Sequence, residues 1–352
     1  MKTWNVGLIG CGGISHVHSL YYASQDKVKI VALCDIIPER AEKRKNEFFP
    51  DAKIYTDYKE LLKDENIDSV DICTPNYLHS IIAVDAFAAG KHVITEKPDA
   101  VSVEEAVRMN EAAEKAGKRL FVMRNNRFVE CSKYAKQFID EGGCGKIYCG
   151  RCGWQRRRGI PGKGGWFTTK EKSGGGPLID LGVHMIDLAI YLMGSPKPVA
   201  VSGAAYCEFA NTDLSDSDHS RFGDKDTNGT YDVEDLAMGF IRFDNGAVLQ
   251  LEFSWASNIE KETRFVELRG TKAGLVWDDG DVKIFTEVAG KLADISSPKL
   301  SNNHGHENAL AHYYDCMING AEPVFVPQQG IDMIKILCAI YKSAETGKEV
   351  LL

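Results

Sequence analysis

The sequence lacks the features that mark membrane-spanning and nucleic-acid-binding proteins. Among its 352 residues no apolar run approaches the ~20 residues that a membrane helix needs, and the first residues lead straight into a strand pattern. We therefore expect neither a signal peptide nor a membrane span. Positive charge is also in deficit, with 42 Lys and Arg against 50 Asp and Glu and a net charge of −8. That sign argues against a nucleic-acid partner.

Convincing metal motifs are lacking as well. The ten cysteines, without a secretory signal, indicate reduced thiols and a cytoplasmic protein. Cys149 and Cys152 form a C-x-x-C in a strand pattern, where residues three apart face opposite sides. The acidic stretch 224–235 approximates a calcium loop, but a strand pattern follows it instead of a helix. His304 and His306 are typical of a polar loop before a helix. We expect no metal site.

The first third of the chain alternates strand and helix patterns. The strand patterns are "VGLI", "KVKIVALCD", "SVDICTP", "KHVITEKP" and "RLFVMRN", and charged or capped helical stretches separate them. Such alternation requires crossover connections, which produce a mostly parallel sheet with helices on both faces. We predict a doubly wound α/β domain of the Rossmann type over residues 1–125.

A glycine-rich turn follows the first strand of this predicted sheet. Gly10 permits the turn, and Gly12 leaves the backbone open to a pyrophosphate group. The helix that begins at Gly13 and Ile14 would supply N–H groups and partial positive charge. Ser15 replaces the usual third glycine or alanine, which still allows close packing. The position of the turn between strand and helix predicts a dinucleotide site rather than a simple bend.

Asp35 ends the second strand, where an acid meets the ribose hydroxyls of a bound dinucleotide. A carboxylate at this place would repel the 2′-phosphate of NADP, so the sequence favours NAD. Arg40, a few residues on, moderates that preference.

The remainder of the chain has a different pattern. β-rich segments separated by turn residues dominate it, and Asp244-Asn245-Gly246 is a strong hairpin signal. We predict a second α+β domain over residues 126–352, built on a mainly antiparallel sheet, whose last helix packs back on the first domain. Leu249, Leu251 and Phe253 alternate along one strand without an obvious helix layer to cover them. A second subunit would be the simplest cover, so we expect a homo-oligomer, a dimer or tetramer.

Two stretches carry groups able to move protons. Glu96-Lys97-Pro98 ends a sheet strand, where cofactor crevices form, and a lysine beside a positively charged nicotinamide suits the role of proton acceptor. Asp180, His184 and Asp187 share one face of a helix, and histidine is the natural proton carrier near neutral pH. On the helix alone, a satisfied core histidine is as good an interpretation.

In this order, "GLIGCGGIS", "CTPNYLH", "EKP" and "GGGPLIDLGVHMIDL" resemble the Gfo/Idh/MocA family of sugar oxidoreductases over essentially the whole chain. The resemblance implies a Rossmann domain, an open-faced antiparallel sheet domain and an active site between them. It implies that Lys97, Asp180 and His184 act on the substrate hydroxyl. The residues that it places by the cofactor are Thr74, Pro75, Asn76, His79 and Glu96.

Within that family, "WQRRRGIPGKGGWFT" resembles members that oxidise a glycoside at a ring hydroxyl, such as levoglucosan and C-glycoside 3-dehydrogenases. Trp166 could stack on a sugar face, while Arg156 donates to its hydroxyls. A solvated basic loop with a core tryptophan is an equal alternative. We count Arg156, Trp166 and Asn126 as candidate substrate-binding residues. The sequence predicts an NAD-dependent dehydrogenase of a sugar, glycoside or cyclic polyol; the alternative is a non-catalytic dinucleotide-binding sensor.

Overall fold

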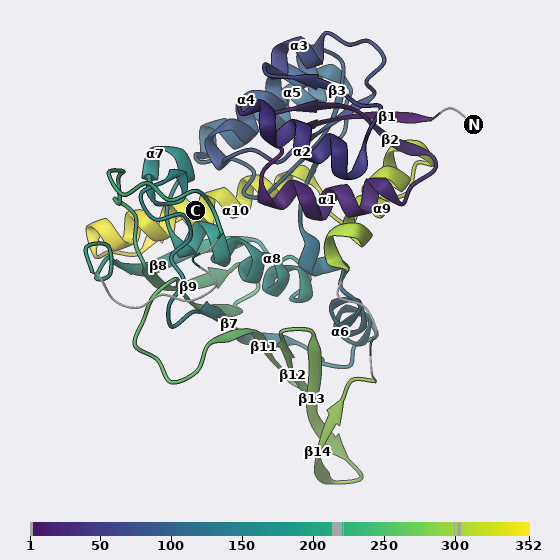
Figure 1. The fold of residues 1–352 in the computed structure, drawn as a ribbon. Coiled ribbons are helices and arrows are strands. Elements are labelled where there is room, and N and C mark those ends of the chain that lie inside the picture. Colours follow the sequence, from purple (N-terminus) through teal and green to yellow (C-terminus); the bar gives the residue numbers. More distant parts are fainter. Residues whose placement is uncertain (1–2, 213–219, 221, 299, 301–303) are drawn as a thin grey trace. The chain divides into compact units, whose positions relative to one another are not determined.

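The computed structural model describes residues 3–212, 220, 222–298, 300 and 304–352. The chain forms two compact units (Figure 1). Unit 1 contains residues Met1–Arg124 and His306–Ile334, and unit 2 contains Asn125–Gly305 and Lys335–Leu352. The sequence placed everything from residue 126 on in the second domain, whereas a C-terminal segment of the structure groups with unit 1.

Unit 1 is a six-stranded parallel sheet with helices on both faces (Figure 1). Its strands are β1 (Trp4–Ile9), β2 (Val28–Cys34), β3 (Lys53–Tyr55), β4 (Ser69–Ile72), β5 (His92–Thr95) and β6 (Leu120–Val122). Its helices are α1 (Gly13–Ala23), α2 (Pro38–Phe48), α3 (Tyr58–Leu62), η1 (Asn76–Leu78), α4 (His79–Ala88) and α5 (Val103–Ala116). The later helix α9 (Gly305–Ile318) lies almost wholly in this unit.

The strand order of this sheet is β3-β2-β1-β4-β5-β6, so it reverses direction between β1 and β4. Ligands of doubly wound sheets bind outside the carboxyl ends of the strands at such a switch point. Strands β1, β2, β4 and β5 all end at this edge. The loops that follow them carry most of the unit 1 residues singled out by the sequence. The prediction of a Rossmann-type fold is confirmed.

Unit 2 is built on a nine-stranded sheet of order β14-β13-β12-β11-β7-β10-β9-β8-β15. The strands are β7 (Ile147–Gln155), β8 (Pro198–Tyr206), β9 (Leu236–Phe243), β10 (Val248–Ser254), β11 (Thr263–Gly270), β12 (Gly274–Asp278), β13 (Asp281–Val288), β14 (Lys291–Ser296) and β15 (Val350–Leu351). Only the β7/β10 pair is parallel among the pairs of described residues. The predicted mainly antiparallel sheet is therefore confirmed.

The helical elements of unit 2 include η2 (Asn125–Phe128), α6 (Glu130–Asp140), η3 (Trp166–Thr168), α7 (Lys170–Ser173), η4 (Leu178–Gly182) and α8 (Val183–Leu192), and α10 (Pro327–Thr346) ends there. The stretch Lys170–Leu192 is long and apolar enough to resemble a membrane span, but 78% of its most apolar window is buried within the structure. It is the core helix of unit 2, and it contacts β7 and β11.

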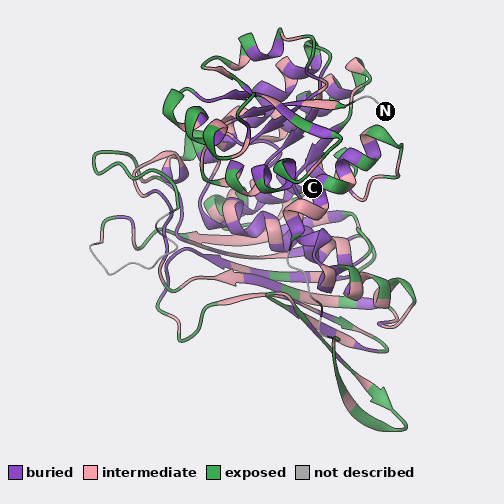
Figure 2. Cartoon of the chain, turned by 45° about the vertical axis from the view of Figure 1, so that its right-hand side comes forward, coloured by how far each residue is buried: buried purple, intermediate pink, exposed green. Residues whose placement is uncertain are grey.

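The sequence argument for an uncovered apolar face is wrong in its choice of residues. Leu249, Leu251 and Phe253 are at most 1% exposed, and the ring of Phe253 packs against Gly182 of η4. These side chains therefore face the chain's own helix. Exposed apolar side chains lie instead on β13 and β14, among them Val288 and Leu292, in the hairpin that Figure 2 shows mostly green.

Candidate active site

The glycine turn after β1 fits the backbone of a dinucleotide. Gly10 has φ +92°, and a Cβ there would lie 2.5 Å from the carbonyl oxygen of Cys73, so only glycine fits. A Cβ on Gly12 would meet nothing within 4 Å, and no side chain caps the start of α1 at this residue. The turn presents open space in front of a helix N-terminus that begins with Gly13 and Ile14, which suits a pyrophosphate.

Asp35 is held at the end of β2 by two backbone donors. Its Oδ2 accepts from the N–H of Cys11 at 2.8 Å, and its Oδ1 accepts from the N–H of Ile37 at 2.9 Å. The carboxylate is thereby tied to the glycine turn itself. The next residue, Ile36, is 86% exposed, and no sequence motif had marked it. An exposed isoleucine at this edge offers an apolar surface for a flat ring.

The loop after β4 carries the predicted residues Thr74, Pro75 and Asn76. The hydroxyl of Thr74 is buried and has no hydrogen-bond partner among the described residues, as expected of a group that awaits a ligand. His79 is fully buried, with its ring nitrogens 2.7 Å from the carbonyl of Pro98 and 2.9 Å from that of Thr74. Burial lowers its pKa although both carbonyls raise it. His79 thus ties the loops after β4 and β5 together.

Lys97 follows β5 and is distinguished by its access to solvent. From Val93 to Ala100 every residue is buried except Lys97. Its backbone N–H donates to Oε2 of Glu96 at 3.1 Å. Glu96 is 5% exposed, and its Oε1 lies 2.9 Å from Nε2 of His18.

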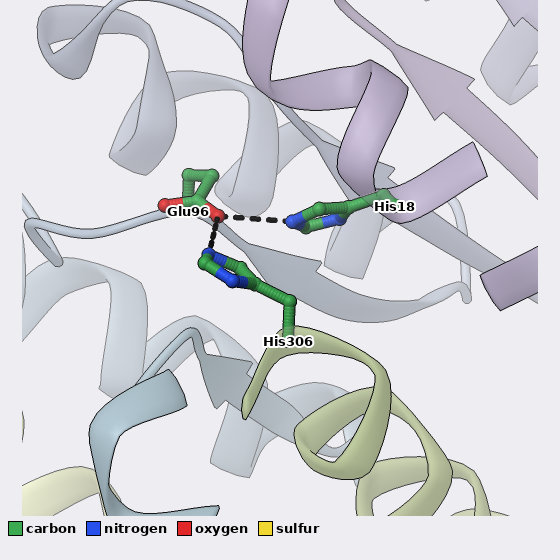
Figure 3. A group of neighbouring side chains, drawn as sticks. All are labelled: His18, Glu96 and His306. Atoms are coloured by element: carbon green, nitrogen blue, oxygen red, sulfur yellow. Dashed lines mark hydrogen bonds and ion pairs between the residues drawn. The ribbon is translucent and has the colours of Figure 1, made fainter. Parts of the chain in front are cut away.

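Figure 3 shows His18, from α1, and His306, from the start of α9, converging on Glu96. The three ligand atoms lie within 4.8 Å of one another, but Nε2 of His18 lies 2.9 Å from Oε1 of Glu96 and so is engaged in a hydrogen bond rather than open to an ion. No sequence motif marked this cluster, because His18 lacked a motif and His306 resembled a loop residue.

In unit 2, the predicted pair Asp180 and His184 lies on η4 and α8. Between Gly175 and Ala189 these are the only two residues that are not buried, so they form one accessible polar face on an otherwise enclosed helix. Asp187, the third predicted member, points elsewhere: it is 4% exposed and accepts both Nε and Nη2 of Arg127 at 2.8 and 2.7 Å. That bidentate pair anchors α8 to η2.

The accessible face is surrounded by aromatic and guanidinium groups. The indole of Trp154 lies 6.0 Å from the His184 ring, centroid to centroid, and 5.2 Å from Cζ of Arg156. Trp255 donates its indole N–H to Oδ2 of Asp180 at 3.0 Å, which fixes the carboxylate. Burial lowers the pKa of Arg156, although the charge of Asp180 opposes this. Arg156 therefore lies at this face.

Asn126 joins the same face through Arg264, a residue that no sequence motif marked. Arg264, from β11, donates to Oδ1 of Asn126 at 2.7 Å and lies 4.4 Å from the Trp154 ring. The side-chain nitrogen of Asn126 is buried and has no partner among the described residues.

Trp166 lies in a loop whose glycines serve packing. A Cβ on Gly164 would lie 1.7 Å from the carbonyl oxygen of Asp226. The backbone N–H of Asp226 donates to the carbonyl oxygen of Lys163 at 3.0 Å. The loop is thus pressed against the segment that resembled a calcium loop. The ring of Trp166 stacks on Phe167 at 3.8 Å.

Glu234 supports the helical segment that carries Asp180, and sequence reasoning missed it because no local motif marks it. It is buried and accepts from the N–H groups of Gly176 at 2.9 Å and Leu178 at 3.1 Å, and from the hydroxyl of Tyr341 at 2.9 Å. These bonds satisfy the first N–H groups of the helical segment that carries Asp180. Burial raises the pKa of Glu234 despite these donors.

Comparisons with known proteins agree with this geometry. Residues 4–124 match the oxidoreductase family with an NAD-binding Rossmann fold, and residues 132–276 match the Gfo/Idh/MocA C-terminal domain. D-glucoside 3-dehydrogenase of Escherichia coli K12 is 32% identical over 347 residues, which are 98% of this chain and 96% of that protein. Levoglucosan dehydrogenase of Pseudarthrobacter phenanthrenivorans is 32% identical over 295 residues, which are 79% of this chain and 74% of that protein.

Among solved structures, levoglucosan dehydrogenase in complex with NADH and levoglucosan superposes with a TM-score of 0.88 at 26% identity and covers 99% of both chains. The orphaned hydroxyl of Thr74 and the open glycine turn fit the cofactor of that structure. The chain belongs to the Gfo/Idh/MocA family of NAD-dependent sugar oxidoreductases.

Proposed function

We propose that this protein oxidises a ring hydroxyl of a glycoside to a ketone, at carbon 3 of a glucoside, with NAD as the hydride acceptor. The relatives named D-glucoside 3-dehydrogenase and levoglucosan dehydrogenase support this substrate class. The observation that carries the proposal is the selective exposure of proton-transfer groups. Lys97 alone is accessible in Val93–Ala100, and Asp180 and His184 alone in Gly175–Ala189. A non-catalytic sensor has no need of such groups.

In the proposed reaction the C–H bond of the carbinol breaks with its electron pair, and bound NAD takes up the hydride. The hydroxyl proton passes to Lys97 or to His184, either of which can act as general base. Asp180, held by the indole of Trp255, orients the substrate or the imidazole. Arg156 and the amide of Asn126 donate to neighbouring hydroxyls, and the indole of Trp154 or Trp166 stacks on the apolar face of the sugar.

The test is an assay of the purified protein with NAD and a panel of methyl glucosides, 1,6-anhydroglucose, free hexoses and cyclitols. The absorbance of NADH measures the rate. Mass spectrometry should find a product that is lighter than the substrate by two hydrogen atoms. Reduction of the product with borodeuteride marks the oxidised carbon. Deuterium at carbon 3 of a glucoside supports the proposal. Turnover of cyclitols alone contradicts the substrate class, and NAD binding without turnover of any sugar favours a sensor.

We also propose that the protein is a homo-oligomer, a dimer or tetramer. The support is the group of exposed apolar side chains on β13 and β14, including Phe285, Val288 and Leu292, the last 93% exposed. Covering them with a second copy removes apolar surface from water. Light scattering at micromolar concentration measures the mass, and a monomer contradicts this proposal. Leu292→Asp should weaken the assembly.

A further inference from the structure

A buried histidine between two carboxylates stands directly behind the candidate catalytic lysine. His18, on α1, is fully buried. Its Nδ1 lies 2.7 Å from Oδ2 of Asp71 on β4. Its Nε2 lies 2.9 Å from Oε1 of Glu96 after β5, a contact that Figure 3 shows. The side chain therefore links three elements of the sheet edge at which the cofactor binds.

The geometry specifies how many protons this ring carries. An ionised carboxylate only accepts hydrogen bonds, so a ring with a carboxylate oxygen at each nitrogen must donate from both. That is the imidazolium form. The alternative, a neutral ring beside a protonated carboxyl, is disfavoured because an imidazole is ordinarily a stronger base than a carboxylate. Burial raises the pKa of Glu96, but the charges of His306 and Lys97 lower it whatever the state of His18.

The other groups around His18 fit a buried cation. The hydroxyl of Tyr22 donates to Oδ2 of Asp71 at 2.7 Å, and it lies 3.0 Å from the hydroxyl of Tyr314 on α9. Sγ of Cys73 lies 3.6 Å from Nδ1. Burial alone would lower the pKa of His18, but the charge of Asp71 and the bonds outweigh it, so that the pKa lies well above its ordinary value.

Glu96 transmits this arrangement to the lysine. One oxygen of its carboxylate meets the His18 ring and the other accepts the backbone N–H of Lys97. Nε2 of His306, which is partly exposed, lies 3.8 Å from the first oxygen. Because Lys97 lies in a loop, its position depends on such side-chain contacts, and Glu96 supplies one that is fixed at both oxygens.

We propose that His18, as a permanent imidazolium between Asp71 and Glu96, is the positioning residue for Lys97 in the dehydrogenase reaction. This inference rests on the proposed function. His18 itself does not reach the substrate: it holds the carboxylate that holds the Lys97 backbone, and its positive charge offsets one of the two carboxylates behind the reacting centre.

The first experiment compares His18→Gln with the wild-type protein and with His92→Gln as matched control. His92 starts β5, at the opposite end of the strand from Glu96, and burial followed by Lys118 and Arg119 lowers its pKa to about 4, so that it carries no charge at neutral pH. We expect His18→Gln to lower kcat by about 10- to 100-fold, as expected for a misplaced reacting group. KM for NAD should stay unchanged, and His92→Gln should behave as wild type.

The charge of His18 has its own signature. Without it two carboxylates stand uncompensated behind the site, which favours the protonated form of a base there, so the acidic limb of the kcat profile should move to higher pH. The double variant His18→Gln/Asp71→Asn removes one positive and one negative charge together. It should return the limb toward the wild-type position, a rescue that a merely structural role would not produce.

The protonation state is read without any activity assay. In protein labelled with ¹⁵N-histidine, the signals lost in His18→Gln identify His18, and both of its nitrogens should show the imidazolium shift up to pH 8. A neutral ring at pH 8 overturns the inference, as does a kcat of His18→Gln within twofold of wild type. A wild-type protein that turns over no sugar overturns the proposed function instead, and the NMR result still decides the state of His18.

Discussion

Two buried glutamates, one in each unit, support the segments that carry the candidate catalytic residues, and their acidities shift in opposite directions. Glu96, directly before Lys97, faces the cationic His18, and its pKa falls to about 2. Glu234, which caps the helical segment of Asp180, faces two backbone N–H groups and a tyrosine hydroxyl, and its pKa is raised. Burial raises both; only Glu96 has a full positive charge to overcome it.

The difference follows from what each glutamate has to hold. A helix is rigid through its own backbone bonds, so Glu234 need only satisfy the first N–H groups of the segment. Lys97 lies in a loop without such bonds, and there a charge-assisted contact gives the fixed position. Neutral donors therefore suffice in unit 2, whereas unit 1 uses a buried ion pair.

The largest expected effect is on folding stability, and it separates the two glutamates. Glu96→Ala leaves His18 with one carboxylate fewer, and breaking a buried ion pair costs about 3–5 kcal/mol. Glu234→Ala leaves two N–H groups and a hydroxyl without their acceptor, at about 1–3 kcal/mol for each group. The substitution also removes a carboxylate whose charge burial disfavours, so we expect the smaller net loss of stability here. Urea unfolding followed by circular dichroism measures both free energies. A greater loss in Glu234→Ala would reverse the comparison.

The next largest expected effect is on kcat, to which one residue from each unit should contribute by a similar factor. Lys97→Ala and His184→Ala should each lower kcat by at least ~10²-fold, the usual contribution of general-base help. NAD binding, measured by NADH fluorescence, should persist because neither residue lies in the glycine turn. The double variant should lose less than the product of the single effects if both act on one hydroxyl. A single variant with near-normal turnover removes that residue from the mechanism.

Asp35 extends the comparison to a third carboxylate. Like Glu234 it accepts from backbone N–H groups, but it lies at the predicted cofactor site. Asp35 accepts from Cys11 and Ile37, and its charge should repel the 2′-phosphate of NADP. Asp35→Ala should therefore narrow the preference for NAD over NADP by about tenfold, the size of a lost charge interaction. Titration of the wild type and the variant with both cofactors measures it. Equal wild-type affinities for NAD and NADP would contradict the role of Asp35.

The last comparison concerns the dependence of stability on pH, which should have opposite signs at the two sites. The folded pKa of Glu96 is depressed, so its contribution is present above the ordinary pKa of about 4.5 and is lost as pH falls toward about 2. The folded pKa of Glu234 is raised, so its contribution is present below that ordinary pKa and is lost as pH rises through the folded value.

Unfolding of Glu96→Gln and Glu234→Gln across this pH range tests the two signs. Glu96→Gln should flatten the acid limb of the stability profile, and Glu234→Gln should flatten the decline above pH 4.5. If the unfolding free energies of the two variants depend on pH in the same way, the charged surroundings of Glu96 and the neutral surroundings of Glu234 have equivalent effects, and the comparison fails.

By itself the sequence determined the features that depend on neighbouring residues. The strand and helix alternation predicted the parallel sheet, the glycine turn predicted the dinucleotide site, and the spacing of Asp180 and His184 put both on one helical face. These are local consequences of backbone geometry and side-chain period. The covered position of Leu249 could not be predicted in this way, because it depends on which element packs over the strand.

Only the tertiary structure decided what surrounds the candidate catalytic residues. His18 meets Asp71 across 53 positions of sequence and Glu96 across 78, and Glu234 reaches Gly176 across 58. Apart from Glu96, which belongs to the Glu96-Lys97-Pro98 motif, each of these side chains has the sequence pattern of an ordinary surface or core residue. Their charge states and partners arise when elements distant in the chain bring them together in the protein interior. A buried carboxylate depends on the few donors within reach.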